Sequence, residues 1–578
     1  MNDIANPLPE LLAPAGSFEA LEAALSAGAD AVYLGGKLFN ARMNAANFSD
    51  EEMKKAVRLA HSVGVKLYVT LNTSLLDHEL NEALHYAAFL YETGCDAVIL
   101  TDLGLASLLR SYVPDLELHA STQLSGHNSA AASFLAERGF SRMVAARELP
   151  REELYALCAR SPIEIECFIH GAHCVSHSGQ CLLSYVQGGR SGNRGECAQP
   201  CRMKYGSGYP LSLRDLTLSA HIPDLLACGV KSLKIEGRMK SPDYVAGVVK
   251  IWRRLLDERR NADPDETEKL NRLFSRSGFT DGYFTKNIGP AMLGVRTDAD
   301  KTASKEVRPH VPRTVRPRLP AIVRERPPVS LPDLPVGRGE KAVYRPDNAL
   351  IWLDPAKMPE RAAEGTEKGA LRRDVDYLPL ECWTPKANGV LLPPVIYDTE
   401  LDAVAEKLAA CRKAGAEHAL VGNIGHIRLA LEAGLTVHGS HRFNLMNTPA
   451  CRMLLDAGLC DLTLSPELTL PQIRDIVKYV PTAVFAYGRL PVMTLEKPLG
   501  LRALTDRTGA CFPVFREGGR DILCNSLPTS MLGAKQKKRL REIGVLRRQF
   551  LFTDETPEAV RIILSGGEPE GQYRRIRE

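Results

Sequence analysis

The stretch ELLAPAGSFEALEAALSAGADAVYLGG, residues 10–36, holds a short apolar run, a helical pattern and a second apolar run. Ser17 has the side chain that a helix N-cap requires, and Gly28 provides the matching stop. The next helical pattern, SDEEMKKAVRLAHSVG, repeats this arrangement with Ser49 and Gly64. A regular alternation of strands and helices predicts an α/β fold built on a parallel sheet.

Eight such strand–helix units follow one another between residue 10 and about residue 260. That number in about 250 residues is typical of a (β/α)8 barrel of the TIM type. An open, doubly wound sheet is the alternative, but it usually has fewer strands before a domain ends. The predicted strands are residues 10–13, 31–34, 66–70, 97–100, 116–120, 142–145, 163–169 and 232–236.

Polar side chains gather where the predicted strands end, which is where the catalytic groups of such barrels lie. Any single one of them could instead cap the following helix, but the set predicts a site at the barrel mouth. As catalytic residues we expect Glu148, His170, Glu236 and Arg238, and as substrate-binding residues at the strand ends Asn40, Arg42, Asn72, Gln123 and Arg147.

Four cysteines lie within 28 residues just after the seventh predicted strand: Cys174, Cys181, Cys197 and Cys201. The segment between them is rich in Gly, Ser, Asn and Arg, so it is predicted to be a long loop, and such loops are usually functional. Its arginines, Arg190 and Arg194, are further candidates for substrate binding.

Three interpretations of the spacing Cys-x6-Cys-x15-Cys-x3-Cys compete. Stable disulfides are rare in a cytosolic chain. Zinc prefers paired Cys-x2–4-Cys motifs, and only the last pair has that spacing. A [4Fe–4S] cluster tolerates irregular spacing and is the interpretation that the loop favours. The interleaved His170, His173 and His177 leave a mixed Cys/His zinc site open.

Familiar hydrolase and dinucleotide motifs are missing from the sequence: it contains no H-E-x-x-H, no G-x-S-x-G and no G-x-G-x-x-G. Cys174 with His170 or His173 could form a thiol nucleophile pair, so a peptidase remains an alternative.

The composition is that of a globular protein, with 44% hydrophobic and 25% charged residues, and 578 residues require two or three domains. A net charge of +4 permits a nucleic-acid partner without demanding one. No run approaches the roughly 18–20 apolar residues of a membrane span. The first residues lack the pattern of a signal peptide, so we expect a cytoplasmic protein.

The predicted domains are a barrel at 1–295 with the cysteine loop at 170–205, a Pro/Arg-rich linker at 296–337, a small irregular or β segment at 338–388, a second α/β lobe at 389–560 and a tail at 561–578. The linker is predicted to be solvated, with a basic arm along a phosphate backbone as the alternative. Its basic residues are Lys301, Lys305, Arg308, Arg313, Arg316, Arg318, Arg324 and Arg326.

An internal repeat links the two halves, because residues 116–149 align with residues 435–468 without a gap. His119 aligns with His438, and Glu148 aligns with Glu467. Further on, Gly171 aligns with Gly488, and Pro491 replaces Cys174. The repeat predicts a duplication. We expect the second lobe to be a degenerate, partial copy of the barrel that supports the fold or binds substrate.

The chain resembles the U32 peptidase family in its opening residues 10–36, in MVAAREL at 143–149, and most specifically in ECFIHGAHCVSHSGQCLLS at 166–184. That last run meets the family signature E-x-F-x-x-G-[SA]-x-C-x4-G-x-C-x-x-S, with His173 where an aliphatic residue is more usual. The resemblance covers residues 10 to about 290, and the second lobe resembles the extension of longer members.

The resemblance implies a function as well as a fold. Better-understood relatives are oxygen-independent hydroxylases that carry a [4Fe–4S] cluster on four cysteines, some acting on C5 of a pyrimidine in tRNA or 23S rRNA, with prephenate implicated. Another branch works in ubiquinone biosynthesis. On this basis we expect an RNA-modifying enzyme with its cluster on the four cysteines, prephenate as a co-substrate and RNA as the partner. The alternatives are a collagenase-like peptidase and a non-catalytic RNA-binding protein with structural zinc.

Overall fold

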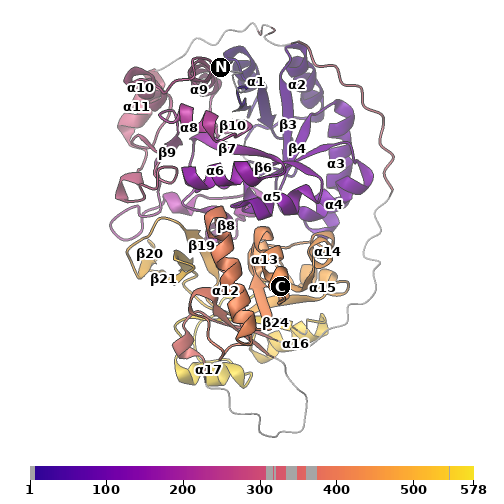
Figure 1. Ribbon diagram of the computed structural model, residues 1–578, viewed down its shortest axis with the longest axis vertical. Helices are drawn as coiled ribbons and strands as arrows, with labels where there is room; N and C mark the ends of the chain where they lie inside the picture. Colours follow the sequence, from indigo (N-terminus) through magenta and orange to yellow (C-terminus); the bar gives the residue numbers. More distant parts are fainter. Residues whose placement is uncertain are drawn as a thin grey trace.

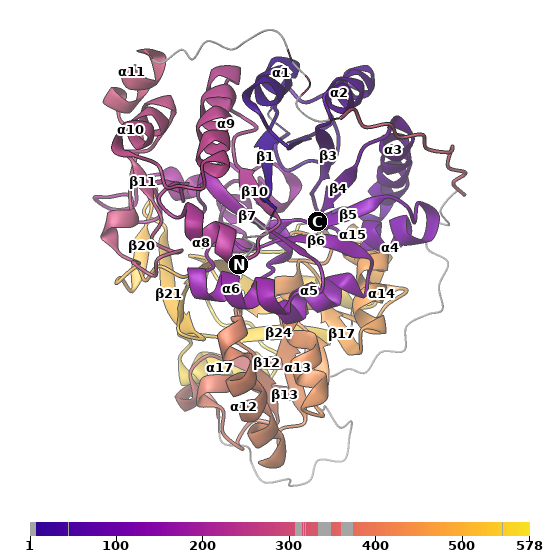
Figure 2. The ribbon, with the colours of Figure 1, turned by 45° about the horizontal axis from the view of Figure 1, so that its top comes forward.

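A computed structural model describes residues 7–43, 45–306, 315, 317, 320–332, 348–359, 374–545 and 547–577. The molecule consists of two α/β barrels stacked on each other, with the first half of the chain above the second (Figure 1). A small antiparallel sheet lies beside the junction, where strands β20 and β21 of the second half reach the level of the first barrel (Figure 2).

The first barrel is closed, since β10 pairs in parallel with both β1 and β7. This closure confirms the predicted (β/α)8 barrel and excludes the open sheet. The predicted strands agree with the observed ones to within two residues at each end. The eight strands are β1 Glu10–Pro14, β2 Ala31–Leu34, β3 Lys66–Leu71, β4 Ala97–Leu100, β5 Glu117–Ala120, β6 Phe140–Val144, β7 Glu164–Gly171 and β10 Ser232–Ile235.

Helices surround this barrel, and their ends follow the capping signals of the sequence. The Ser17 hydroxyl accepts a hydrogen bond from the Ala20 N–H, and Ser49 forms a capping box with Glu52. Gly28 ends α1 in the left-handed conformation. The helices are α1 Phe18–Ala27, α2 Asp50–Ser62, α3 Leu80–Thr93, α4 Leu103–Tyr112, α5 Ser129–Ala136, α6 Arg151–Arg160, α8 Ile222–Ala227, α9 Pro242–Asp257, α10 Pro264–Leu273 and α11 Asp298–Glu306.

Charged side chains fill part of the barrel interior. Glu166 is fully buried and lies 2.8 Å from Lys234 and 3.2 Å from Arg142, which also binds Glu10 at 2.7 Å. Burial raises the pKa of Glu166, but Lys234 and Arg142 outweigh it and hold that pKa at about 2. The barrel therefore depends on a buried charge network as well as on apolar packing.

The second half of the chain is a complete barrel, so the prediction of a degenerate, partial copy is wrong. Its eight parallel strands close because β18 pairs with both β17 and β24. Two of them, β12 and β13, come from the segment at 338–388 that was expected to be a small separate unit. The strands are β12 Ala349–Trp352, β13 Val375–Pro379, β14 Gly389–Leu391, β15 His418–Val421, β16 Thr436–Gly439, β17 Leu459–Thr463, β18 Thr482–Gly488 and β24 Arg547–Phe552.

The helices of the second barrel are α12 Leu401–Lys413, α13 Ile427–Glu432, α14 Thr448–Asp456, α15 Leu470–Val477, α16 Ala534–Glu542 and α17 Pro557–Leu564. The end of the chain returns to this barrel, since the Arg577 carbonyl accepts a hydrogen bond from the Leu470 N–H.

Each barrel has a long insertion between its seventh and eighth strands, and the two insertions share one antiparallel sheet. Strand β8 of the first insertion pairs with β19 of the second, with Met493 opposite Cys181. The first insertion contains β8 Ser176–Cys181, α7 Leu183–Gly188 and β9 Asp215–Thr217, and the short strand β11 Phe279–Thr280 pairs with β9. The second contains β19 Pro491–Leu495, β20 Ala503–Thr505, β21 Cys511–Glu517, β22 Arg520–Cys524 and β23 Thr529–Ser530.

The barrels meet at the carboxyl ends of their strands, and the contact is close to two-fold symmetric. Asn128 caps α5 and donates to the Ile396 carbonyl of the second barrel at 2.8 Å. Its repeat partner Asn447 caps α14 and donates to the Leu75 carbonyl of the first barrel at 2.9 Å. The second barrel therefore covers part of the first barrel's mouth.

The described part of the linker lies on the first barrel. Ile322 donates its N–H to the His61 carbonyl at 2.9 Å, and Arg324 forms an ion pair with Asp96 at 2.7 Å. Four of the basic residues singled out in the sequence lie outside the described residues: Arg308, Arg313, Arg316 and Arg318. Among the described residues, no helix has the length and apolar character needed to cross a membrane.

Candidate functional site

The cysteine loop leaves the first barrel at the carboxyl end of β7 through Gly171. This residue has a φ of 106°, and a Cβ here would lie 2.4 Å from the Glu236 carbonyl oxygen. Only glycine fits this close approach of the seventh and eighth strands. The loop and the end of the eighth strand are thereby fixed side by side.

None of the four cysteines forms a disulfide, and Cys181 lies within electrostatic range of the other three. Cys174 and Cys197 are exposed, whereas Cys181 and Cys201 are partly covered. Among the described residues, no three of the cysteine sulfurs lie within 4.8 Å of one another.

The surroundings of the sulfurs provide hydrogen-bond donors. An Arg147 guanidinium nitrogen lies 3.9 Å from the Cys174 sulfur, and the Gln199 N–H donates to Cys197 at 3.4 Å. Burial raises the pKa of the Cys201 thiol to about 12, and it also raises the pKa of Cys181 and Cys197. Thiols that burial keeps protonated become thiolates when a metal binds, so these three residues and the exposed Cys174 offer the four sulfur ligands that a [4Fe–4S] cluster would need.

A carboxylate between two guanidinium groups lies next to this loop. Glu236 binds Arg147 at 2.9 Å and Arg42 at 3.3 Å. Burial raises the pKa of Glu236, but the two arginines outweigh it and hold the pKa at about 2. Glu236 raises the pKa of Arg42, and about a third of the Arg42 side chain is exposed. One carboxylate shared by two arginines leaves positive charge at the open mouth.

Three of the expected rim residues, Arg238, Asn40 and Asn72, support the loop that carries Arg42. Arg238 is buried and donates to Thr70 at 2.9 Å and to Asn40 at 3.1 Å, and burial lowers its pKa to about 10. Asn40 is also buried, and it donates to the Gly36 carbonyl. Asn72 accepts from the Ala41 N–H at 3.0 Å. These contacts hold the loop that carries Arg42.

The remaining candidates lie elsewhere. His170 is buried against Trp252, Tyr244 and Phe279, and burial lowers its pKa to about 3. Gln123 lines a polar cavity between the barrels together with Ser74, Asn423 and Arg442. Arg194 binds Glu79 at 2.6 Å, and Arg190 donates to the Glu196 carbonyl, so both brace the cysteine loop.

Glu148 lies in a buried group of side chains whose contacts the sequence did not predict. Its carboxylate contacts His127 and His177, and His177 contacts Glu496 from the second barrel's insertion. Burial raises the pKa of Glu148, but the two histidines outweigh it and hold the pKa well below its usual value. Of this group the sequence had singled out Glu148 and His177, and no motif pointed to His127 or Glu496.

Two closed α/β barrels that meet mouth to mouth, with a loop of four free cysteines at one mouth, define a two-barrel α/β protein. The chain belongs to peptidase family U32, because the family model matches residues 16–292 and 386–517.

Named relatives differ in function. The chain is 41% identical over 307 residues to "23S rRNA 5-hydroxycytidine C2501 synthase" of Escherichia coli (strain K12), covering 51% of this chain and 46% of that protein. It is 39% identical over 274 residues to "tRNA hydroxylation protein P1" of Bacillus subtilis (strain 168), covering 44% of this chain and 65% of that protein. It is also 34% identical over 306 residues to "Collagenase" of Porphyromonas gingivalis (strain ATCC BAA-308 / W83), covering 48% of this chain and 73% of that protein. The first two matches thus span less than two thirds of those relatives' own length.

Proposed function

We propose that this protein is an iron–sulfur RNA hydroxylase that modifies C5 of a pyrimidine in ribosomal or transfer RNA. The cluster would be held by Cys174, Cys181, Cys197 and Cys201. The observation that carries this proposal is the position of the exposed Cys174 beside the Arg42–Glu236–Arg147 group. The names of the two RNA-modifying relatives support the choice of RNA.

The charge of this group suits an anionic co-substrate. Hydroxylation replaces a C–H bond by C–OH, a two-electron oxidation of the base that needs a source of oxygen and an acceptor for two electrons. Prephenate, which carries two carboxylates, is the co-substrate that we propose. Arg42 and Arg147 would bind one carboxylate through planar guanidinium groups, while Glu236 keeps both side chains in place. A bound [4Fe–4S] cluster supplies one-electron transfer.

RNA would approach from the side that the second barrel leaves open. Sequence-specific enzymes bind single-stranded RNA by stacking its unstacked bases on flat or apolar side chains. Exposed apolar residues occur in the β2–α2 loop, next to the cysteines and after β10: Leu38, Met43, Met203 and Met239. The partly exposed Arg42 adds a flat cationic surface among them.

A peptidase is the second candidate, favoured by the name of the collagenase relative. A cysteine peptidase needs a histidine that takes the proton of the thiol. The hydrogen bond of the Cys174 sulfur is with Arg147, and His170 and His173 are both buried. The geometry therefore supports the hydroxylase better.

Anaerobic purification followed by iron, sulfide and zinc counts tests the proposal. We expect about four irons and four sulfides per chain, as one [4Fe–4S] cluster contains, and a broad absorption band near roughly 400 nm. Cys174→Ser should remove the iron, whereas Cys511→Ser, an exposed cysteine in the second insertion, should not. A wild-type protein without iron or sulfide would overturn the proposal. Zinc that disappears with Cys174→Ser would point to the structural-zinc alternative.

A further inference from the structure

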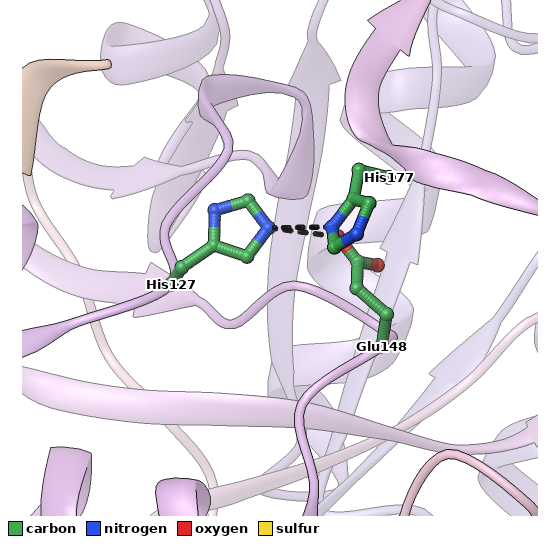
Figure 3. A group of neighbouring side chains, drawn as sticks. All are labelled: His127, Glu148 and His177. Atoms are coloured by element: carbon green, nitrogen blue, oxygen red, sulfur yellow. Dashed lines mark hydrogen bonds and ion pairs between the residues drawn. The ribbon is translucent and has the colours of Figure 1, made fainter. Parts of the chain in front are cut away.

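The group behind the cysteine loop brings three ligand atoms together from separate elements. The Glu148 Oε1 atom lies 2.8 Å from His127 Nε2 and 2.8 Å from His177 Nδ1, and the two nitrogens are 3.2 Å apart (Figure 3). All three side chains are buried. Among the described residues, this is the one group of three such side chains whose ligand atoms all lie within 4.8 Å.

The opposite ring nitrogens fix where the protons lie. His127 Nδ1 is 2.7 Å from the Ser125 carbonyl, and His177 Nε2 is 3.0 Å from the Glu496 carboxylate. Carbonyl and carboxylate oxygens only accept, so both of these nitrogens carry a hydrogen. In a neutral imidazole the other nitrogen then has a lone pair. Both lone pairs therefore point toward the Glu148 oxygen.

The Glu148 Oε1 atom accepts a hydrogen bond from the Ser178 N–H at 2.9 Å, but this bond gives neither histidine lone pair a partner, so the arrangement favours a cation between the three atoms. If His177 takes up one extra proton, the His127 lone pair still faces the Glu148 oxygen at 2.8 Å with no hydrogen between them, so these two atoms repel each other. Two extra protons place imidazolium nitrogens 3.2 Å apart in a buried site. A metal ion satisfies all three atoms at once. Bonds of about 2.0–2.1 Å at tetrahedral to octahedral angles separate neighbouring ligand atoms by roughly 2.9–3.4 Å, close to the spacing here.

The surroundings also match those of known metal sites. Histidine ligands almost always donate their other ring N–H to a carboxylate or a backbone carbonyl. His177 does the first through Glu496, and His127 does the second through Ser125. Arg520 in turn holds the Glu496 carboxylate at 2.8 Å. Glu496 and Arg520 belong to the second barrel's insertion, so the site joins both barrels.

We propose that His127, Glu148 and His177 bind one divalent transition-metal ion, separate from the four cysteines, that fastens the cysteine loop to both barrels. The ligand set, two histidines and one carboxylate, suits zinc or iron(II). The burial of the site indicates a structural ion. His177 lies three residues beyond Cys174, so the ion would fix the strand from which the cysteine loop continues.

Zinc and iron counts on the full-length protein test this site. After reconstitution with Zn²⁺ and removal of loosely bound metal, we expect about one zinc per chain, as one such three-ligand site would hold. His127→Gln and His177→Gln should each abolish the zinc while iron on the cysteines stays. His119→Gln, at another buried histidine of the same barrel, serves as the matched control and should keep both metals.

A second variant keeps the test decisive if the ligand variants fail to fold. Glu496→Gln retains all three ligands, and we expect it to weaken zinc binding about 10- to 100-fold in competition with a chelator. Extra iron that is lost in the same histidine variants would support the same site with another ion. A protein that takes up no metal beyond that held by the cysteines, or whose zinc is unaffected by both histidine variants, would overturn the inference.

Discussion

The two barrels have one architecture and different chemistry. Gly171 and Gly488 are the last residues of the two seventh strands, and both have a positive φ. A Cβ on either would meet a carbonyl oxygen at the end of the eighth strand, that of Glu236 or Leu551. At the equivalent positions the first barrel has Glu236 and Arg147, and the second has Leu551 and Pro466. The second barrel thus has the same backbone arrangement, but it has no counterpart of the Arg147–Glu236 ion pair.

The interiors of the two barrels also share their architecture but differ in their charged residues. Arg142 of the first barrel aligns with Asp461 of the second. Arg142 binds buried carboxylates, whereas Asp461 binds His438 at 2.6 Å and Arg547. Each interior balances its charges, but the signs at this position are reversed. Both barrels therefore pair their buried charges, although different residues provide them.

The largest difference between the barrels should appear on removal of single cysteines. We expect Cys181→Ser to abolish iron binding and lower RNA hydroxylation at least about 100-fold, because the cluster loses a ligand. Cys524→Ser, at a buried cysteine of the second insertion, should leave both unchanged. Iron counts and nucleoside mass spectrometry give the comparison. Equal losses in the two variants would show that these cysteines act through folding.

Breaking the charge network of each barrel should cost stability in both. Glu166→Gln leaves Lys234 and Arg142 without their buried carboxylate, and we expect a loss of about 3–5 kcal/mol in the free energy of unfolding. Asp461→Asn should cost a similar amount in the second barrel. Denaturant titrations that resolve the two barrels measure both, and a loss under about 1 kcal/mol for either would contradict the balanced interior.

The same carboxylate predicts a pH dependence. The pKa of Glu166 in the folded protein is about 2, below its ordinary value of 4.5. Its stabilising effect is therefore complete above about pH 4.5 and is lost as the pH falls toward 2. We expect the wild type to lose more stability than Glu166→Gln between these values. Unfolding free energies that fall equally with pH in the two proteins would contradict the low pKa of Glu166.

The glycines at the seventh strands should respond alike in stability and differently in function. Gly171→Ala and Gly488→Ala each force a Cβ against a backbone carbonyl at positive φ, so we expect losses of about 1–3 kcal/mol. Only Gly171→Ala displaces Glu236, so only this variant should lower hydroxylation by folded protein. Thermal unfolding and nucleoside analysis separate the two effects, and equal activity in both variants would count against a role for Glu236.

The smallest effects should come from the reciprocal asparagines at the junction. Asn128→Ala and Asn447→Ala each remove a helix cap and a hydrogen bond to the other barrel, and we expect each to cost about 1–2 kcal/mol. Unfolding free energies of the two variants should agree if the junction is two-fold symmetric. A loss of stability in only one of the two variants would show that the two symmetric contacts do not contribute equally to the free energy of unfolding.

Much of the fold could be predicted from local sequence, and much of the site could not. Strand–helix alternation and the caps at Ser17 and Ser49 predicted the first barrel, because these signals lie within a few residues of one another. The second barrel was underestimated, since β12 and β13 are short apolar strands with no clear helical pattern to mark their units. The four cysteines form a local motif, so the sequence alone could single them out as candidate ligands.

Side-chain groups built from distant segments escaped prediction. His177 and Glu496 meet across 319 residues of sequence, and His127 and His177 across 50. Their contact depends on how the two insertions pair, which no local pattern encodes. For His170, the place at a strand end favoured a catalytic role, and in the structure its ring packs against Trp252.

The central claim, RNA hydroxylation at the cysteine site, is tested most directly by mass spectrometry of nucleosides from ribosomal and transfer RNA. Cells lacking this gene would be compared with cells complemented by the wild type or by Glu236→Gln. We expect one hydroxylated pyrimidine to disappear with the gene, to return with the wild type and to stay absent with the variant. Identical nucleosides in all three strains would contradict the claim.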